Sequence, residues 1–129
     1  MSTSSSQHWS PADIDAFSAD ELTIATRRSD GSLRKGVIIW MVTFGSDLYI
    51  RAVKGVDGPW FRGAVSTHSA EVTVGNKSWS TALEEMGDAN AAEIDAAYLA
   101  KYSKYPSQYV DSVLTPGSIA ATLRVVPSA

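Results

Sequence analysis

The chain has 129 residues, of which 44% are hydrophobic and 19% are charged, and it contains no cysteine. These values are typical of one globular domain, and they exclude disulfides, thiolate nucleophiles and cysteine-based zinc sites. The net charge is −3, yet residues 27–62 carry seven basic and three acidic side chains, which favours a small anionic ligand over nucleic acid.

The N-terminal residues "MSTSSSQHW" lack the basic region and apolar run of a secretory signal, and no apolar run is long enough to span a bilayer. We therefore expect a soluble, cytoplasmic protein. Residues 1–8 are polar and serine-rich, which predicts a disordered tail ahead of a single domain over residues 9–129.

The first half of the domain predicts one helix and three strands. The segment "SPADIDAFSAD" is typical of a helix, with Ser10 as its cap and Pro11 at its first position. The segment "ELTIATRR" predicts a strand that ends at the turn "SDGS". The next segment, "LRKGVIIWMVTF", is apolar at both parities, as in a strand buried on both faces, and "LYIRAV" predicts a third strand.

The second half predicts three helices and three strands. A short helix, "PWFRGAVST", begins at Pro59 with Asp57 as its cap. The strongest helix pattern, "GDANAAEIDAAYLAKYSKY", begins at Asp88 or Asn90 and is stopped by Pro106. The other expected elements are the strands "AEVTV" and "WSTALEEM", the short helix "SQYVDSVL" and the closing strand "SIAATLRVVP".

This order of elements predicts an α+β fold. Six short strands with inserted helices are typical of a small antiparallel β-barrel that carries helices at its ends. Closing the sheet into a barrel also removes the exposed edges that a flat six-stranded sheet would have.

The stretch "RAVKGVDGPWFRGA", residues 51–64, is the first candidate site. Its glycines let a ligand approach the main chain, and a helix that begins at Pro59 points its free amides back at the loop. Amides, guanidinium groups and an indole plane suit a phosphate-bearing planar cofactor. The competing interpretation is a glycine-rich connection with Trp60 anchored in the core. The expected ligand contacts here are Arg51, Lys54, Gly55 and Trp60.

The second candidate site is the basic hairpin "TRRSDGSLRK" over residues 26–35. Arg27 and Arg28 end one predicted strand, and Arg34 and Lys35 begin the next. The four side chains therefore meet at one end of the hairpin, where they can bind phosphate or carboxylate groups. The alternative is a solvated hairpin tip that binds no ligand.

The third candidate site is the long helix over residues 87–105, which places three tyrosines and Lys101 on one arc. A nearby cation lowers the pKa of a phenol, which makes Tyr98 and Lys101 candidates for proton transfer. The alternative is an amphipathic helix whose tyrosine rings pack on the barrel. His68, the one histidine outside the tail, is a further catalytic candidate, and it has no second histidine in the domain to support a metal site.

Two of these segments, "TRRSDGSLR" and "DLYIRAVKGVDGPWFRG", resemble the small split-barrel flavoproteins, above all their deazaflavin-dependent nitroreductase branch. The closer resemblance, over most of residues 20–126, is to domain-of-unknown-function family 2255. The segments that carry it are "IWMVTFGSDLYIRAVKGVDGPWFRG", "IDAAYLAKYSKY" and "ATLRV". This resemblance implies an FMN-binding split-barrel fold and a homodimer with the cofactor between its subunits.

The resemblance also implies roles for the site residues. The basic hairpin would hold the phosphate or acidic tail of the cofactor. The loop would run along the cofactor, with Trp60 near its ring or near the substrate. The implied cofactor contacts are Arg27, Arg28, Arg34, Lys35, Arg51, Lys54, Gly55 and Trp60.

The leading hypothesis is a nitroreductase-like oxidoreductase that uses FMN or a deazaflavin on a small organic molecule. One alternative is a cofactor-free lyase or isomerase that moves protons through Tyr98, Lys101 or His68 near Arg51. Another is a non-catalytic protein that binds a small anion. The expected partner is thus a small anionic molecule together with a second copy of the chain, and neither nucleic acid nor a membrane.

Overall fold

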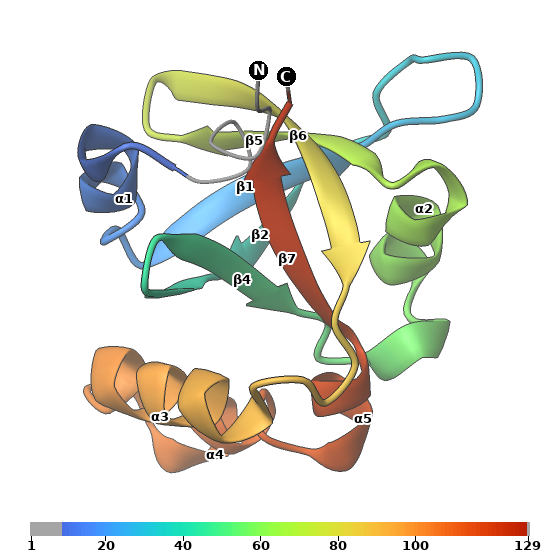
Figure 1. The fold of residues 1–129 in the computed structure, drawn as a ribbon. Coiled ribbons are helices and arrows are strands. Elements are labelled where there is room, and N and C mark those ends of the chain that lie inside the picture. The colour runs from blue at the N-terminus through green and yellow to red at the C-terminus, as the bar shows by residue number, and fades with distance from the viewer. Residues whose placement is uncertain (1–8, 129) are drawn as a thin grey trace.

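The sheet of this protein is a nearly closed barrel of seven antiparallel strands, as seen in the computed structural model, which describes residues 9–128 (Figure 1). The strand order is β2-β1-β5-β6-β7-β4-β3, so β2 and β3 are the two ends of the sheet. The disordered tail expected over residues 1–8 lies outside the described residues. The strands are β1 (Glu21–Thr26), β2 (Val37–Trp40), β3 (Val42–Phe44), β4 (Asp47–Arg51), β5 (Ser69–Val74), β6 (Lys77–Glu85) and β7 (Thr122–Pro127).

The two end strands are consecutive in the chain, and only Met41 separates them. β2 pairs with β1 and β3 pairs with β4, so the covalent chain at Met41 joins the two ends of the sheet. The single strand expected over residues 33–44 is therefore two strands, and the expected count of six strands is wrong by one. The α+β barrel with flanking helices is confirmed.

The break at Met41 is held by side chains of the long helix α3 (Ala91–Tyr102). The Tyr102 hydroxyl accepts the Met41 N–H at 3.0 Å and lies 2.7 Å from the Met41 carbonyl oxygen. Lys101 Nζ donates to the same carbonyl at 2.8 Å. Because buried main-chain polar groups must be paired, these two side chains take the place of a neighbouring strand at this position.

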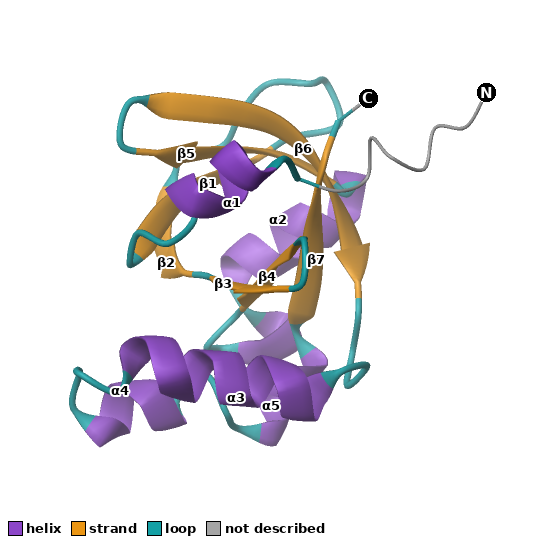
Figure 2. Cartoon of the chain, turned by 60° about the vertical axis from the view of Figure 1, so that its left-hand side comes forward, coloured by secondary structure: helices purple, strands orange, loops and turns teal. Residues whose placement is uncertain are grey.

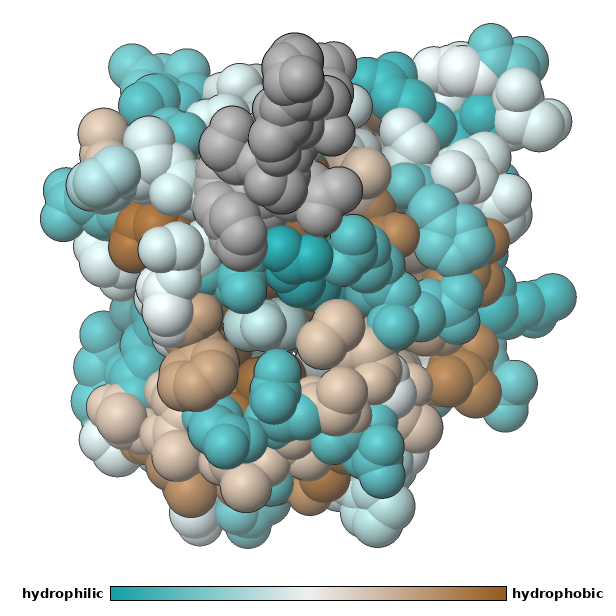
Figure 3. Space-filling view, in the orientation of Figure 1, coloured by the Kyte–Doolittle hydropathy of each residue, from teal (hydrophilic) through white to brown (hydrophobic). Residues whose placement is uncertain are grey.

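Three helices, α3, α4 (Ser107–Asp111) and α5 (Pro116–Ala120), cover one end of the barrel (Figures 1 and 2). The helices α1 (Pro11–Ala16) and α2 (Pro59–Thr67) lie on opposite sides of it in Figure 1, and the 3-10 turn η2 (Gly55–Asp57) precedes α2. The surface over α3 is mostly weakly hydrophobic in Figure 3, because five of its twelve residues are alanine. Within the described residues no helix combines the length and hydropathy needed to cross a membrane.

Two expected element boundaries are wrong. The strand expected from Ser118 begins only at Thr122, because residues 116–120 form α5. Thr115 Oγ1 accepts the Ser118 N–H at 3.1 Å and Pro116 occupies the first turn, which is a regular helix start. Asp57 does not cap α2, since Gly58 holds the N-cap position and makes no side-chain bond.

Hydrophobic side chains fill two regions. The larger lies within the barrel and includes Phe17 and Ile50, and the smaller includes Tyr98 of α3. The expected burial of both faces of β2 is wrong, because Val37 is 37% exposed and Ile38 is 65% exposed. β2 is an end strand that lacks a second neighbour, and its apolar side chains remain uncovered.

Candidate functional site

A cavity of about 520 Å³ opens between β2, the residues after β4, the start of α2 and the region of α4. We call it the indole pocket, after Trp40 and Trp60 in its lining. Glu21, Arg51, Lys54 and Ser112 contribute polar side chains, and the rest of the lining is aliphatic, aromatic, proline or glycine. The remaining lining residues are Val37, Ile38, Ile39, Trp40, Ala52, Val53, Gly58, Pro59, Trp60, Tyr109 and Val113.

The two indoles reach the pocket from different elements. Trp40 ends β2, and its ring stacks on Tyr102 with centroids 4.0 Å apart and planes 5° apart. Trp60 lies in the first turn of α2 and packs against the barrel core. Pro59 sets the start of that helix, which fixes the position of Trp60 relative to the sheet. Indole planes in a mainly apolar pocket favour a ligand with a flat, apolar part.

A second, more polar hollow adjoins the indole pocket. Its lining is Arg34, Pro59, Arg62 and Gly63, so the two hollows share Pro59. Arg34 Nη1 donates to the Arg27 carbonyl at 2.8 Å and to the Gly63 carbonyl of α2 at 3.4 Å, which places this guanidinium beside α2. Arg62 is exposed on α2. Two guanidinium groups therefore stand next to an apolar cavity, an arrangement suited to a ligand with an anionic tail.

Arg51, expected as a ligand contact, lies in the wall of the indole pocket with its side chain fully buried. Its Nη1 donates to Asp95 Oδ1 at 2.5 Å and to the Val113 carbonyl at 2.9 Å, and its Nε donates to Thr122 Oγ1 at 3.0 Å. Its Nη2 has no partner among the described residues. Arg51 thus ties β4 to α3, to β7 and to the segment after α4 that carries Val113.

Two loop residues after Arg51 lie in different surroundings, Lys54 at the indole pocket and Gly55 against α5. Lys54 lies in the lining of the indole pocket. Gly55 instead packs against Gly117 of α5, where an added Cβ would meet the Gly117 carbonyl oxygen at 3.4 Å, and its φ is +76°. Glycine is favoured here by the left-handed backbone, since a Cβ would meet α5 only at ordinary contact distance.

The basic hairpin is mostly occupied with its own backbone. Arg27 Nη1 donates to the Gly31 carbonyl and Arg28 Nη1 to the Leu33 carbonyl, each at 3.0 Å. Lys35 is exposed and lines neither hollow. Of the four basic residues expected at this end, the structure brings Arg34 alone to the polar hollow.

The candidates for proton transfer on α3 lie away from the indole pocket. Tyr98 is buried, with the Arg51 guanidinium 5.4 Å from its ring centroid, and burial raises the pKa of its phenol. Lys101 Nζ donates to the carbonyls of Phe17 and Met41, and burial lowers the pKa of Lys101 to about 8. Neither side chain belongs to the pocket lining, and each has a place in the packing of α3 on the barrel.

His68 lies in a different part of the structure from Tyr98 and Lys101. It ends α2 in the left-handed conformation, with φ +55°, and its Nε2 lies 2.8 Å from Glu85 Oε2 on the surface. The structure does not bring His68, Tyr98 and Lys101 together in one cavity. In the described part of the chain, no group of three His, Cys, Asp or Glu side chains is placed to hold a metal ion.

Sequence reasoning missed the pocket residues outside the loop. Trp40 lies in an apolar run that is typical of a buried strand, so the pattern did not indicate that Trp40 lines a cavity. Tyr109 and Ser112 belong to α4 or follow it directly, and nothing local connects them to residues 37–60. The one signal in the sequence was Trp40 itself, a large aromatic residue in the predicted strand.

Comparisons with known proteins agree on the fold. The family model described as "Uncharacterized protein conserved in bacteria (DUF2255)" matches residues 13–125. No curated protein sequence matches the chain.

Several solved structures are similar to the chain at low sequence identity, and three represent them. The heme storage protein HutZ from Vibrio cholerae has a TM-score of 0.66 at 10% identity, covering 92% of this chain and 90% of that one. An F420-H2-dependent reductase, FDR-A, has a TM-score of 0.58 at 16% identity, covering 83% and 93%. An FAD-binding protein from Mesorhizobium loti has a TM-score of 0.59 at 16% identity, covering 95% and 93%. These likenesses show a split-barrel fold.

Proposed function

This chain belongs to the DUF2255 family, and from that premise we propose that it is an oxidoreductase that binds FMN or a deazaflavin and acts on a small organic molecule. One observation carries the proposal. The apolar indole pocket and a separate hollow, whose lining includes the guanidinium groups of Arg34 and Arg62, share Pro59 in their linings. A flavin-type cofactor has the same two parts, a flat ring system and an anionic tail.

The residues present fit such a group. Trp40 and Trp60 offer flat apolar surfaces for the ring, while Arg34 and Arg62 offer charged donors for the tail. Lys54 adds a further cation to the pocket lining. When bound, the cofactor supplies hydride transfer, and the protein supplies binding, orientation and exclusion of water.

Heme is the competing ligand, because similar structures include a heme storage protein. Heme iron in proteins is held by histidine, cysteine, methionine or tyrosine. Among the described residues that line the indole pocket, Tyr109 is the one side chain of these types. Two guanidinium groups beside the pocket and a single candidate iron ligand give better support to a flavin-type cofactor.

A cofactor-free lyase or isomerase has less support. Its proposed groups, Tyr98, Lys101 and His68, face different surroundings and none lines the indole pocket. Proton transfer to a substrate needs the acid or base within hydrogen-bond reach of it. A non-catalytic anion-binding protein remains as an outcome of the binding experiment below.

We also propose that the protein forms a homodimer around this pocket. Val37, Ile38, Val53 and Tyr109 line the pocket and are between 37% and 65% exposed. Exposed apolar side chains gathered at one site are typical of an interaction surface. A second copy that covered them would close the pocket from water.

The decisive experiment is a titration of the purified protein with FMN and with a deazaflavin, followed by absorbance and tryptophan fluorescence. We expect quenching of tryptophan fluorescence and binding in the micromolar range for one of the two. Trp60→Leu should weaken that binding. Inorganic phosphate serves as a third titrant. If phosphate binds and neither FMN nor the deazaflavin binds, the protein is a non-catalytic anion-binding protein and the oxidoreductase proposal is wrong.

A further inference from the structure

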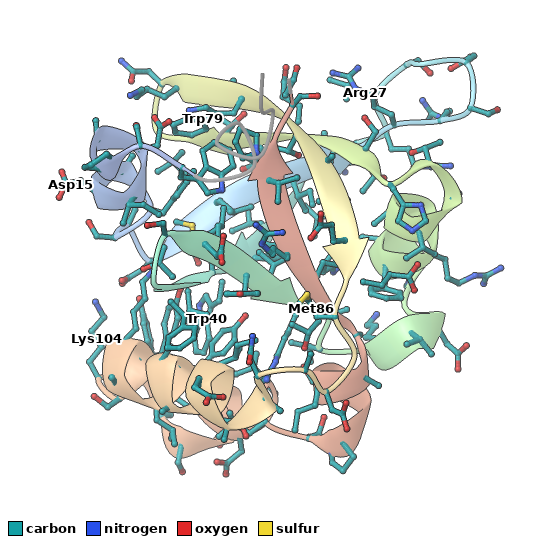
Figure 4. The ribbon with its side chains drawn as sticks, viewed as in Figure 1. Asp15, Arg27, Trp40, Trp79, Met86 and Lys104 are labelled. Carbon is teal, nitrogen blue, oxygen red and sulfur yellow. The ribbon has the colours of Figure 1, made fainter. Side chains whose placement is uncertain are left out.

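Aromatic side chains form a continuous cluster that begins at the wall of the indole pocket. Trp40 lines the pocket, its ring stacks on Tyr102, and its centroid lies 5.3 Å from that of Tyr105. Tyr98 lies behind Tyr102, with centroids 5.9 Å apart. Figure 4 shows Trp40 between the sheet and α3. Rings in such contact let an electron pass from one to the next.

The three tyrosine hydroxyls of this cluster differ in what they face. The Tyr105 hydroxyl donates to the carboxylate oxygen Oδ2 of Asp20 at 2.7 Å. The Tyr102 hydroxyl faces the carbonyl oxygens of Asp20 and Met41, and the Tyr98 hydroxyl is buried without a partner among the described residues. A phenol that loses an electron also loses its proton and needs a base in reach. Within the cluster, the Tyr105 phenol is the one that has a carboxylate in this position.

The carboxylate of Asp20 also has a cationic partner. Lys104 Nζ lies 2.7 Å from the same oxygen, Oδ2. The hydrogen bonds from Lys104 and Tyr105 hold the pKa of Asp20 below its usual value, so the group is an ionised base at neutral pH. Trp40, Tyr105 and Asp20 therefore form a path from the pocket wall to a partly exposed carboxylate.

We propose that Trp40 and Tyr105 form an electron-donating relay that carries an oxidising equivalent out of the indole pocket, with Asp20 as the proton acceptor. A one-electron oxidant in the pocket first takes an electron from the Trp40 indole, which leaves a tryptophan radical cation. Tyr105 then donates one electron to the Trp40 radical cation, which restores the neutral indole, and passes its phenolic proton to Asp20. The products are the reduced oxidant, a neutral tyrosyl radical and the carboxylic acid of Asp20, so one electron and one proton are balanced.

The relay goes beyond the proposed oxidoreductase function and does not depend on it. Hydride transfer moves two electrons, so the one-electron oxidant of the relay is instead an organic radical that enters or forms in the indole pocket. In a pocket where redox chemistry takes place, such a path moves an unwanted radical from the residues around the ligand to Tyr105. The aromatic contacts and the Asp20 hydrogen bond are present whether or not a cofactor is bound, so the relay can be tested separately.

The test oxidises the full chain with flash-generated tris(bipyridine)ruthenium(III), a one-electron oxidant, and records radicals by electron paramagnetic resonance after freezing. Tyr109, exposed at the pocket, is changed to Phe in every sample to remove a direct target. We expect a tyrosyl radical that loses most of its signal in Tyr105→Phe and keeps it in Tyr98→Phe, the matched control. Failure of FMN binding does not affect this measurement.

Two further variants test the path itself. Trp40→Phe should remove most of the tyrosyl signal, and Asp20→Asn should leave a tryptophan radical in its place, with Asp20→Glu restoring the tyrosyl signal. An unchanged tyrosyl signal in Tyr105→Phe, or an equal loss in Tyr98→Phe, would overturn the proposal. So would an unchanged signal in Trp40→Phe, since Tyr105 would then be oxidised directly. If Asp20→Asn does not fold, the Tyr105 and Trp40 variants decide the matter.

Discussion

The Tyr102 hydroxyl and the backbone of Met41 form a two-way contact at the point where the barrel closes. The Met41 N–H donates to the hydroxyl at 3.0 Å, and the Met41 carbonyl lies 2.7 Å from it. At this residue the chain leaves β2, paired with β1, and enters β3, paired with β4. The Tyr102 hydroxyl therefore pairs with both main-chain groups of Met41, Lys101 Nζ also donates to the carbonyl, and α3 is part of the barrel closure.

This contact predicts unequal effects for two tyrosines of α3. Tyr102→Phe leaves the buried N–H of Met41 unpaired, while the Met41 carbonyl keeps its bond from Lys101, and it should cost about 1–3 kcal/mol of unfolding free energy. Tyr98→Phe removes a buried hydroxyl that has no described partner, so its effect should stay within about 0.5 kcal/mol or be slightly stabilising. Urea unfolding of both variants measures the difference. Equal losses would show that ring packing, rather than the hydroxyl of Tyr102, holds the closure.

Lys101 predicts a stability that rises with pH. Burial lowers the pKa of Lys101 to about 8 in the folded protein, while in the unfolded chain the ordinary value applies. Between about pH 8 and pH 9.5 the unfolded chain binds a proton that the folded protein has released, so the unfolding free energy contributed by Lys101 increases with pH. Urea unfolding across this range should show the rise in the wild type and not in Lys101→Met. A parallel pH profile in both proteins would assign the effect to other groups.

The ion pair between Arg51 and Asp95 predicts a coupling between α3 and the pocket wall. Asp95→Asn should cost about 1–2 kcal/mol of unfolding free energy, because the buried Arg51 guanidinium loses its counter-charge while Asp95 is itself partly exposed. Since Arg51 also bonds the Val113 carbonyl, the variant should weaken ligand binding in the indole pocket as well. Asp111→Asn, at an exposed position, is the control. Unchanged stability in Asp95→Asn would mean that the negative charge of Asp95 is not needed to keep Arg51 buried.

Local signals in the sequence were sufficient for much of the fold. The bounds of α2 were predicted to the residue from Pro59, and the predicted cap Ser10 does accept the Asp13 N–H. Continuous hydrophobicity could not reveal that the strand over residues 33–44 breaks at Met41, because the break depends on Tyr102, sixty-one positions away.

The candidate site was predictable only in part, for the same physical reason. Lys54 and Trp60 were predicted from a local motif and do line the pocket. Arg51 was predicted as a ligand contact from the same motif, yet its partners Asp95 and Val113 come from distant elements, and its side chain is buried among them. From the sequence alone, a charged side chain can be a ligand contact or a buried group that links secondary-structure elements. Only the tertiary structure shows which partners it has.

The exposed apolar side chains of β2 predict the oligomeric state. Ile38→Asp places a charge in the proposed dimer surface beside the indole pocket and should shift the protein from dimer to monomer. Leu99→Asp is the matched control, since Leu99 is 50% exposed on α3 and does not line the pocket. Size-exclusion chromatography with light scattering measures both variants. A wild-type monomer at every concentration would rule out the homodimer.

The polar hollow predicts which arginine matters for an anionic tail. Arg62→Ala should weaken FMN binding about tenfold, equivalent to the loss of one charge-assisted hydrogen bond. Arg28→Ala is the matched control, because Arg28 bonds its own hairpin and lies outside both hollows. Isothermal titration at low and high salt should show a weaker salt dependence for Arg62→Ala than for the wild type, since one cation that faces the phosphate is gone. If Arg28→Ala weakens binding as much as Arg62→Ala does, the tail lies along the hairpin, and the basic hairpin rather than the hollow beside Pro59 is the anion site.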